Sequence, residues 1–248
     1  MNATAPVPNP AALAQDGFAV IGEVVDEATV AGVAAAVERH LASSPAGGSA
    51  GLRDLASLVG EVSDLAELPA LRDLASEVLG RAAFAVRVLF FDKNPEANWK
   101  VAWHQDLTLA VSERREVAGF GPWSVKAGIH HVQPPVAVLE RMITLRLHLD
   151  DCDAANGALR VLPGSHRAGR LAAEAIQAWR SQTRETVCAV PRRGVLLMRP
   201  LLLHASAPSE HPRHRRVIHV EFAGEDLPGG LQWLEKGRLP AGKSSAGN

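Results

Sequence analysis

The segment VAWHQDLTL, residues 101–109, carries two side chains that can bind a metal, set two positions apart in an apolar run. In an extended strand alternate side chains share a face, so His104 and Asp106 would point the same way while Trp103 and Gln105 point opposite. An imidazole and a carboxylate on one face can both bind one metal ion. His-x-Asp pairs also arise by chance, and a surface turn is the plain alternative, so a metal site requires a third ligand elsewhere.

His204 is the candidate for the third ligand. It stands in the segment MRPLLLHASAP, at the end of an apolar run and before small residues. A lone histidine in such a place is more often a buried core residue with a hydrogen-bond partner than a ligand. Two histidines and one carboxylate, however, form the set that leaves positions on iron open for a co-substrate and dioxygen. Zinc accepts the same ligands, so these residues alone do not choose the metal.

An arginine-rich segment, SEHPRHRRVIHVEFA, follows His204 and leads into the last predicted strand. An arginine beside an open iron site can hold a dicarboxylate through a bidentate pair of hydrogen bonds, which lysine cannot match. Arg215 and Arg216 compete for this role. Strand alternation is ambiguous here and slightly favours Arg216.

Several motifs in a fixed order resemble one known family. The chain has WHQD, then NGALRVLPGSHRAGRL at 156–171, then LLLHASAP, and an arginine eleven residues after the histidine. Over about residues 84 to 223 this resembles the phytanoyl-CoA dioxygenase family. Members of that family are Fe(II)- and 2-oxoglutarate-dependent oxygenases built on a double-stranded β-helix.

The resemblance implies a role for each matching residue. The Fe(II) ligands would be His104, Asp106 and His204. Arg215 has the family's spacing and would bind the distal carboxylate of 2-oxoglutarate, which takes precedence over the weak preference for Arg216. Gln105 and Ser206 match positions that contact this co-substrate in relatives.

Two further points come from the resemblance. The PGSH element, residues 163–166, is a family hallmark that we interpret as a loop-shaping turn. Related halogenases have a small residue at the position of Asp106, which leaves room for chloride. The aspartate of this chain therefore favours hydroxylation, or a desaturating or ring-forming variant, over halogenation.

The elements that would position these residues are mostly short strands. Between residues 82 and 225, apolar β-rich segments alternate with Gly, Pro and Asn-Gly. A helical flank over 1–81 precedes them, with helices expected at 26–43 and 64–79. The predicted fold class is mainly β with flanking helices, a double-stranded β-helix (jelly roll, cupin-like). We expect a single oxygenase domain over 1–248, with its jelly-roll core at 82–225 and a flexible tail at 239–248.

Substrate contacts are sought in two places. Residues 107–140 show few strand signals and contain GFGPW, so they are expected to form a lid insertion. In MITLRLHLDD, leucines alternate with a polar face, which would meet solvent in an ordinary sandwich and line the cavity in this barrel. Lys93 is expected in solvent, with contact to substrate or co-substrate as the alternative. The candidate substrate-binding residues are Thr144, Arg146, His148, Trp123, Lys126 and Lys93.

Composition limits the partners of the protein. The formal net charge of the 248 residues is −1 and the basic residues are spread along the chain, which argues against a nucleic-acid partner or an anionic membrane surface. The sequence shows neither a signal peptide nor an apolar run of membrane-spanning length. Two cysteines without a Cys-x-x-Cys pair suit a reducing compartment. We expect a cytoplasmic enzyme whose partners are a small-molecule substrate and dioxygen; the sequence does not determine its oligomeric state.

Two other classes of function stay open at this stage. One is a cupin-like metal-dependent isomerase or hydrolase that uses zinc or manganese without 2-oxoglutarate, and such an enzyme has no need of the downstream arginine. The other is a non-catalytic small-molecule-binding barrel, against which the three intact candidate ligands argue. The identity of the substrate cannot be inferred from these residues.

Overall fold

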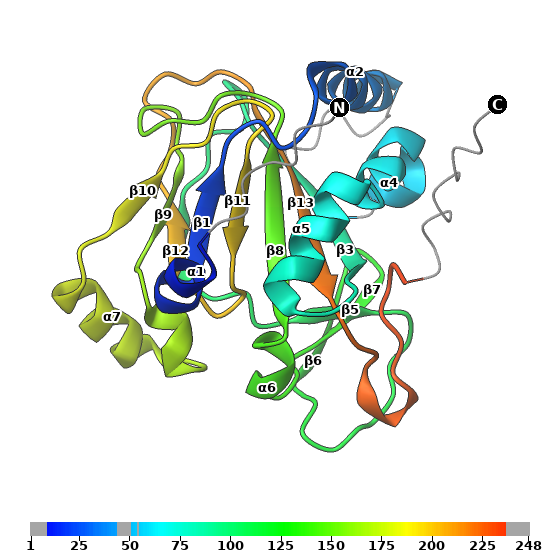
Figure 1. The fold of residues 1–248 in the computed structure, drawn as a ribbon, viewed down its shortest axis with the longest axis vertical. Helices are drawn as coiled ribbons and strands as arrows, with labels where there is room; N and C mark the ends of the chain where they lie inside the picture. The colour runs from blue at the N-terminus through cyan, green and yellow to red at the C-terminus, as the bar shows by residue number, and fades with distance from the viewer. Residues whose placement is uncertain (1–8, 44–50, 54, 237–248) are drawn as a thin grey trace.

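The computed structural model of the chain describes residues 9–43, 51–53 and 55–236. Its largest element is a six-stranded sheet in which all neighbouring strands are antiparallel (Figure 1). The strand order is β1 (Phe18–Ile21), β11 (Val195–Met198), β8 (Met142–His148), β13 (Arg215–Ala223), β3 (Phe84–Lys93) and β2 (Gly51–Leu52).

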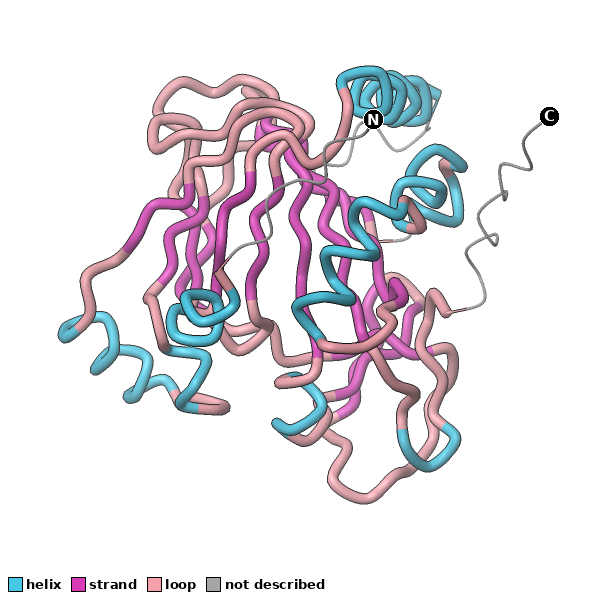
Figure 2. The backbone as a smooth tube through the Cα atoms, viewed as in Figure 1, coloured by secondary structure: helices cyan, strands magenta, loops and turns pink. Residues whose placement is uncertain are grey.

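Two smaller antiparallel sheets complete the strand framework, which is drawn in magenta in Figure 2. The four-stranded sheet contains β10 (Thr186–Cys188), β9 (Leu159–Val161), β12 (His204–Ser206) and β4 (Val101–His104), in that order. The three-stranded sheet has the order β5 (Leu109–Val111), β7 (Ile129–Val132) and β6 (Trp123–Lys126). The strand-rich architecture with flanking helices is the predicted one.

The helices from the first third of the chain cover one face of the six-stranded sheet (Figure 1). They are α2 (Glu27–Ser43), α3 (Leu55–Leu58), α4 (Gly60–Ala66) and α5 (Pro69–Leu79). Leu145, Leu147 and Leu149 turn toward these helices and join a buried apolar cluster with them, as their alternation predicts. Thr144, Arg146 and His148 therefore occupy the opposite face of the sheet.

The remaining helical segments are short or peripheral. Helix α1 (Pro10–Asp16) precedes β1, and α6 (Val136–Leu139) precedes β8. Helix α7 (Ala173–Gln182) contains no buried residue. Two 3₁₀ turns cover Ser165–Ala168 and Pro228–Gly230. Among the described residues, no helix combines the length and the apolar character needed to span a bilayer.

One predicted helix is wrong in its extent. The sequence predicts a single helix over 64–79, whereas the structure has α4 ending at Ala66 and α5 beginning at Pro69. Proline lacks an N–H and disfavours helical geometry in the residue before it, here Leu68 with ψ 127°. Pro69 therefore starts a new helix, and Gly80 ends it in the left-handed conformation.

Residues 107–140 contain more regular structure than their few strand signals predict. The segment includes the strands β5, β6 and β7 and helix α6. The strands are only three or four residues long, and His130 and His131 interrupt the apolar pattern of β7, so no alternation was readable. The role of the segment as a lid stays a prediction. The predicted flexible tail, 239–248, lies outside the described residues.

Candidate metal centre

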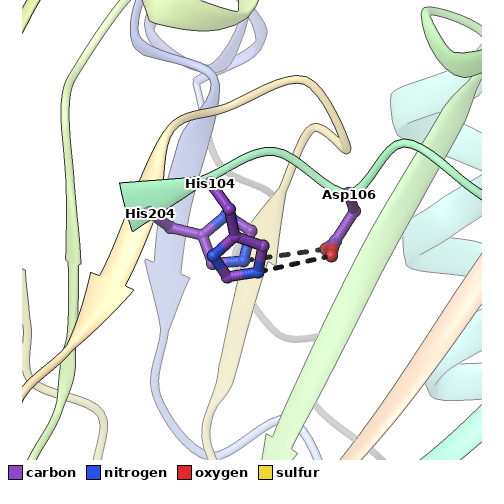
Figure 3. A group of neighbouring side chains, drawn as sticks. All are labelled: His104, Asp106 and His204. Atoms are coloured by element: carbon purple, nitrogen blue, oxygen red, sulfur yellow. Dashed lines mark ion pairs between the residues drawn. The ribbon is translucent and has the colours of Figure 1, made fainter. Parts of the chain in front are cut away.

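The structure brings His104, Asp106 and His204 together, although the last two are almost one hundred positions apart in the chain (Figure 3). One donor atom from each residue lies within 4.8 Å of the other two. The Nε2 atoms of His104 and His204 are each 3.8 Å from an oxygen of the Asp106 carboxylate. Strands β4 and β12 pair so that the two histidines are direct cross-strand partners, which explains the proximity of their rings, 4.2 Å between centroids.

The hydrogen bonds of the two histidines fix which nitrogen is free. His104 Nδ1 lies 2.8 Å from the carbonyl oxygen of Ala102, and His204 Nδ1 lies 2.9 Å from that of Leu202. A carbonyl oxygen only accepts, so each Nδ1 carries the proton and each Nε2 presents its lone pair. Both lone pairs are thus directed toward the carboxylate side of the cluster (Figure 3). Imidazoles that bind metals are commonly oriented in this way, with the other ring N–H donating to a carbonyl oxygen.

Strand alternation does not explain the position of Asp106. Strand β4 ends at His104, and Asp106 lies in the following loop, where its backbone N–H donates to the carbonyl oxygen of Pro200 at 2.9 Å. That bond ties the loop to the segment that precedes His204. His104 and Asp106 do lie close together. The predicted reason, a shared strand face, is wrong because the strand ends before the aspartate.

The residues of this cluster fit a divalent cation. Asp106 Oδ2 is inaccessible to solvent and has no hydrogen-bond donor, which is unfavourable for a carboxylate oxygen unless a cation neutralises it. Burial raises the pKa of Asp106, but attraction to His204, His219 and His104 in their protonated forms, and to Arg87, outweighs it and holds that pKa below its usual value. Burial lowers the pKa of His204 to about 4, so its ring is neutral and available at pH 7.

The two candidate arginines point to opposite sides of β13. Arg215 lines the cavity that contains the three candidate ligands. It is 3% exposed, its Nη1 donates to the carbonyl oxygen of Gly157, and its Nε has no hydrogen-bond partner. Arg216 instead donates to both carboxylate oxygens of Asp150, at 2.9 and 2.6 Å, and also pairs with Glu38. Of the two arginines, Arg215 alone lines the cavity.

Ser206 and Lys93 lie against Arg215. Ser206 lines the cavity; its hydroxyl donates to the carbonyl oxygen of Gly157 at 2.9 Å and accepts a 2.6 Å hydrogen bond from Lys93 Nζ. The expectation of a solvated Lys93 is wrong, because the side chain is 1% exposed and also bonds to the carbonyl oxygen of Ala207. Burial, followed by the charge of Arg215, lowers the pKa of Lys93 to about 8.

Gln105 lines the cavity, but its side-chain amide is hydrogen-bonded to backbone groups. Its Nε2 donates to the carbonyl oxygens of Gly169 and Leu201, at 2.8 and 2.7 Å, and its Oε1 accepts from the N–H of Leu171 at 2.9 Å. Both amide protons are thus used to fasten the loop around residue 170 to the segment before His204. Its contact with the co-substrate stays a prediction.

The PGSH turn supports the neighbourhood of His204. Ser165 is fully buried; its hydroxyl donates to the carbonyl oxygen of Leu162 and accepts from the N–H of Leu203, at 2.7 and 2.9 Å. Gly164 adopts a left-handed conformation with φ 79°, which glycine tolerates best. The element lies outside the cavity lining and anchors the chain next to His204, in keeping with its interpretation as a loop-shaping turn.

The cavity has a volume of about 380 Å³, and the inner face of the six-stranded sheet supplies much of its wall. Of the three polar residues predicted on β8, Arg146 lines the cavity, whereas Thr144 and His148 are buried on the same face outside its lining. Arg146 Nη1 donates to Nδ1 of His219 at 2.8 Å. Both ring nitrogens of His148 lack a hydrogen-bond partner.

The segment 107–140 contributes one of its two candidates to the cavity. Lys126, at the end of β6, lines the cavity and is exposed. Trp123, at the start of the same strand, packs instead against a separate apolar cluster that includes Phe120 and Trp233. Arg114 lies 5.6 Å from the Trp123 ring and pairs with Glu116 at the surface.

Sequence reasoning missed four ionisable residues in the cavity wall. They are Arg53, Arg87, His219 and Glu221. Two signals pointed to three of them. His219 and Glu221 share the strand face of Arg215, so they follow it into the cavity once the motif spacing assigns Arg215 there. Arg87 is the one charged residue in the otherwise apolar run AAFAVRVLFF.

The sequence model of the family "Phytanoyl-CoA dioxygenase (PhyH)" matches residues 13–216. No curated protein sequence matches the chain.

Solved structures share the fold over most of the chain. EctD from S. alaskensis with 2-oxoglutarate and 5-hydroxyectoine is 18% identical, with a TM-score of 0.67 over 87% of this chain and 74% of that one. The epimerase SnoN from nogalamycin biosynthesis, a non-haem alpha-ketoglutarate-dependent enzyme, is 17% identical, with a TM-score of 0.65 over 89% and 88%. The carbocyclase SnoK from the same pathway is 15% identical, with a TM-score of 0.68 over 93% and 88%. At these identities the likeness shows the double-stranded β-helix fold and no more.

Proposed function

The chain belongs to the phytanoyl-CoA dioxygenase family of iron- and 2-oxoglutarate-dependent oxygenases, and we propose that it hydroxylates an unactivated C–H bond of a small organic substrate. In this reaction 2-oxoglutarate and dioxygen are converted to succinate and CO2, and one oxygen atom enters the substrate. The observation that carries the proposal is the placement of His104, Asp106 and His204 in one cavity with Arg215.

The side chains of this protein would divide the work as follows. His104 and His204 would bind iron through Nε2 and Asp106 through its carboxylate, which leaves open positions for co-substrate and dioxygen. Ferrous iron with 2-oxoglutarate supplies the oxidising chemistry that breaks the C–H bond. Arg215 would hold the distal carboxylate of 2-oxoglutarate by a charge-assisted pair of hydrogen bonds.

The surroundings of Arg215 would preorganise that contact. The Arg215 guanidinium and the Ser206 hydroxyl both donate to the carbonyl oxygen of Gly157. This contact holds the guanidinium in place, so the side chain needs no reordering when an anion binds. Its Nε, which is buried without a partner, would gain one from the carboxylate. Lys93 adds a second positive charge behind Ser206. In a cupin-like enzyme that does not use 2-oxoglutarate, Arg215 and Lys93 would have no co-substrate carboxylate to bind.

Solved structures of the same fold support this assignment. SnoN has been solved with Fe3+, alpha ketoglutarate and nogalamycin RO, and EctD with 2-oxoglutarate and 5-hydroxyectoine. Epimerase and carbocyclase members also occur on this fold, so the outcome at the substrate requires a direct test.

The test is a screen for succinate release against candidate small molecules, with Fe(II), ascorbate and 2-oxoglutarate present. Each substrate that stimulates succinate formation is then converted under ¹⁸O2 and its product mass is measured. Hydroxylation predicts the gain of one labelled oxygen atom. An unchanged mass with altered stereochemistry would indicate epimerisation instead of hydroxylation. The loss of two hydrogen atoms would indicate desaturation or ring closure.

Two further outcomes address the other classes of function. Turnover with zinc or manganese and no requirement for 2-oxoglutarate, together with an unaffected Arg215→Ala variant, would favour the metal-dependent isomerase or hydrolase. Absence of any iron-dependent consumption of 2-oxoglutarate, with or without added compounds, would favour the binding barrel.

A further inference from the structure

We propose that the substrate is an organic anion whose carboxylate or phosphate group is held at one end of the cavity by Arg53, Arg87 and Lys126, here called the cationic end. This proposal rests on the proposed function, because it concerns the same cavity. It adds the chemical class of the substrate and the residues that select it.

The cationic end is distinct from the end where Arg215 lies. Along β13, Arg215 faces Lys93 of β3, whereas Glu221 faces Arg87. Six residues of strand separate the two positions, about 20 Å along the backbone. His219 lies between them on β13 and lines the same cavity. Arg215 and Arg87 therefore mark two separated basic positions in the cavity that also contains the candidate metal ligands.

Three separate segments supply the cations. Arg53 directly follows β2, whose Leu52 pairs with Phe90 of β3. Arg87 belongs to β3, and Lys126 lies at the end of β6, where the hairpin to β7 begins. Arg87 Nη2 lies 3.3 Å from Nε2 of His131. Burial, and then the charges of Arg87, Lys126 and Arg53, lower the pKa of this imidazole. Segments far apart in sequence thus place like charges in the wall of one cavity.

The available carboxylates do not neutralise this end. Among the described residues that line the cavity, Asp106 and Glu221 are the acidic ones. Glu221 is already engaged, since its Oε1 accepts from Arg87 Nη1 at 3.0 Å and lies 3.5 Å from His219 Nε2. Lys126 and Arg53 are left facing the cavity without an acidic residue of its wall beside them.

A charge count for the loaded site leads to the same point. The two charges of Fe(II) and the charge of Arg215 balance those of Asp106 and the two carboxylates of 2-oxoglutarate. The cavity wall then still carries Arg53, Arg87, Lys126 and Arg146 against the single carboxylate of Glu221, a formal excess of three positive charges. Burial and the nearby Arg215 already lower the pKa of Arg146 to about 10. An anion reduces this excess; a neutral or cationic substrate leaves it or increases it.

The rest of the wall fits an apolar body behind the charged group. Phe91 and Trp99 contribute aromatic surface, and Leu89, Val101 and Leu107 contribute aliphatic surface. In a cavity of about 380 Å³ a compact organic anion fits better than a long or polymeric one. Fixing its charged end at Arg53 and Lys126 would leave the apolar body facing the metal ligands.

The test measures binding of matched probes to the full-length protein under anaerobic conditions, with Fe(II) and saturating 2-oxoglutarate. The probes are phenylacetate and phenyl phosphate, with phenylacetamide and 2-phenylethanol as neutral counterparts. Tryptophan fluorescence, to which Trp99 in the cavity wall contributes, reports binding. We expect the better anion to bind at least tenfold more tightly than the neutral probes and to weaken as salt is added. The carboxylate and phosphate arms identify the preferred charged group.

The variants use an exposed lysine, so folding is not at risk. Lys126→Ala should weaken binding of the preferred anion about fivefold or more, and Lys126→Arg should retain it. Lys100→Ala is the matched control, because Lys100 is exposed and adjoins Trp99 and Val101 without lining the cavity. Equal affinity of anionic and neutral probes, no saturable binding of either anion, or equal effects of Lys126→Ala and Lys100→Ala would each overturn the proposal.

Failure of this proposal is distinguishable from failure of the proposed function. The preference for anions should persist in Arg215→Ala, because the cationic end lies away from that residue. Loss of the preference in Arg215→Ala would show that the probes bind at the co-substrate position, and the cationic end would be rejected. Iron-dependent 2-oxoglutarate consumption is measured separately and is not affected by that result.

Discussion

Neighbouring arginines with opposite environments allow a sharp test of the co-substrate site. Arg215 faces the cavity and Arg216 faces Asp150 and Glu38 on the other side of β13. Replacing each with alanine removes the same functional group one position apart. We expect the two variants to lose different properties, affinity for 2-oxoglutarate in the first and conformational stability in the second.

The magnitudes follow from the contacts. A hydrogen-bonded contact to a charged group contributes about 1.5–3 kcal/mol, so Arg215→Ala should raise the Kd for 2-oxoglutarate roughly 10- to 150-fold. In Arg216→Ala the carboxylate of Asp150, which is 19% exposed, loses a bidentate partner at 2.6 and 2.9 Å. A loss of about 1.5–3 kcal/mol in the free energy of unfolding corresponds to a decrease in Tm of roughly 3–12 °C for a chain of this size.

Anaerobic titration of the Fe(II) protein with 2-oxoglutarate measures the first quantity, and thermal unfolding of the metal-free protein measures the second. Lys replacements at both positions serve as controls that keep the charge but lose the bidentate geometry. An unchanged Kd in Arg215→Ala combined with a weakened one in Arg216→Ala would refute the assignment and restore the preference that strand alternation suggested.

Three further predictions concern the same cavity. Asp106→Ala should abolish substrate oxidation, and near-normal turnover would remove this residue from the ligand set. Gly157→Ala should weaken 2-oxoglutarate binding, because a Cβ would lie 2.8 Å from the carbonyl oxygen of Ala207 and displace the carbonyl group that holds Arg215. Gly80→Ala has a similar positive φ and open space around it, so it should affect stability alone; equal 2-oxoglutarate affinity in the two glycine variants would contradict the argument. Gln105→Ala leaves three backbone groups without partners and should lower the free energy of unfolding by about 1–3 kcal/mol in thermal or urea unfolding, whereas wild-type stability would mean that water replaces the amide.

Strand-rich segments and the order of motifs were readable from the sequence. The long strands β3, β8 and β13 have seven or more residues each, and their apolar pattern predicts them. The short strands β5, β6, β7 and β10 have three or four residues, too few for a period to emerge, and they form because neighbouring strands pair with them. The break between α4 and α5 was readable at Pro69, since proline disfavours helical geometry in the residue before it.

The candidate site shows the same division. The family resemblance assigned Arg215 where local alternation favoured Arg216, because alternation indicates which residues share a face but not which face lines the cavity. Lys93 was expected in solvent, and its burial depends on acceptors from a distant segment, Ser206 and Ala207. Only tertiary structure brings those groups together. Arg53 and Lys126 likewise line one cavity from a sheet edge and a hairpin that no local sequence pattern relates.

The most direct test of the account is an anaerobic titration of the protein with Fe(II) and then 2-oxoglutarate, followed by visible absorption. We predict a weak metal-to-ligand charge-transfer band that saturates at one iron and one 2-oxoglutarate per chain and is lost in His204→Ala. A protein that develops no such band, or a His204→Ala variant in which the band is unchanged, would contradict the claim that these three side chains hold iron for 2-oxoglutarate.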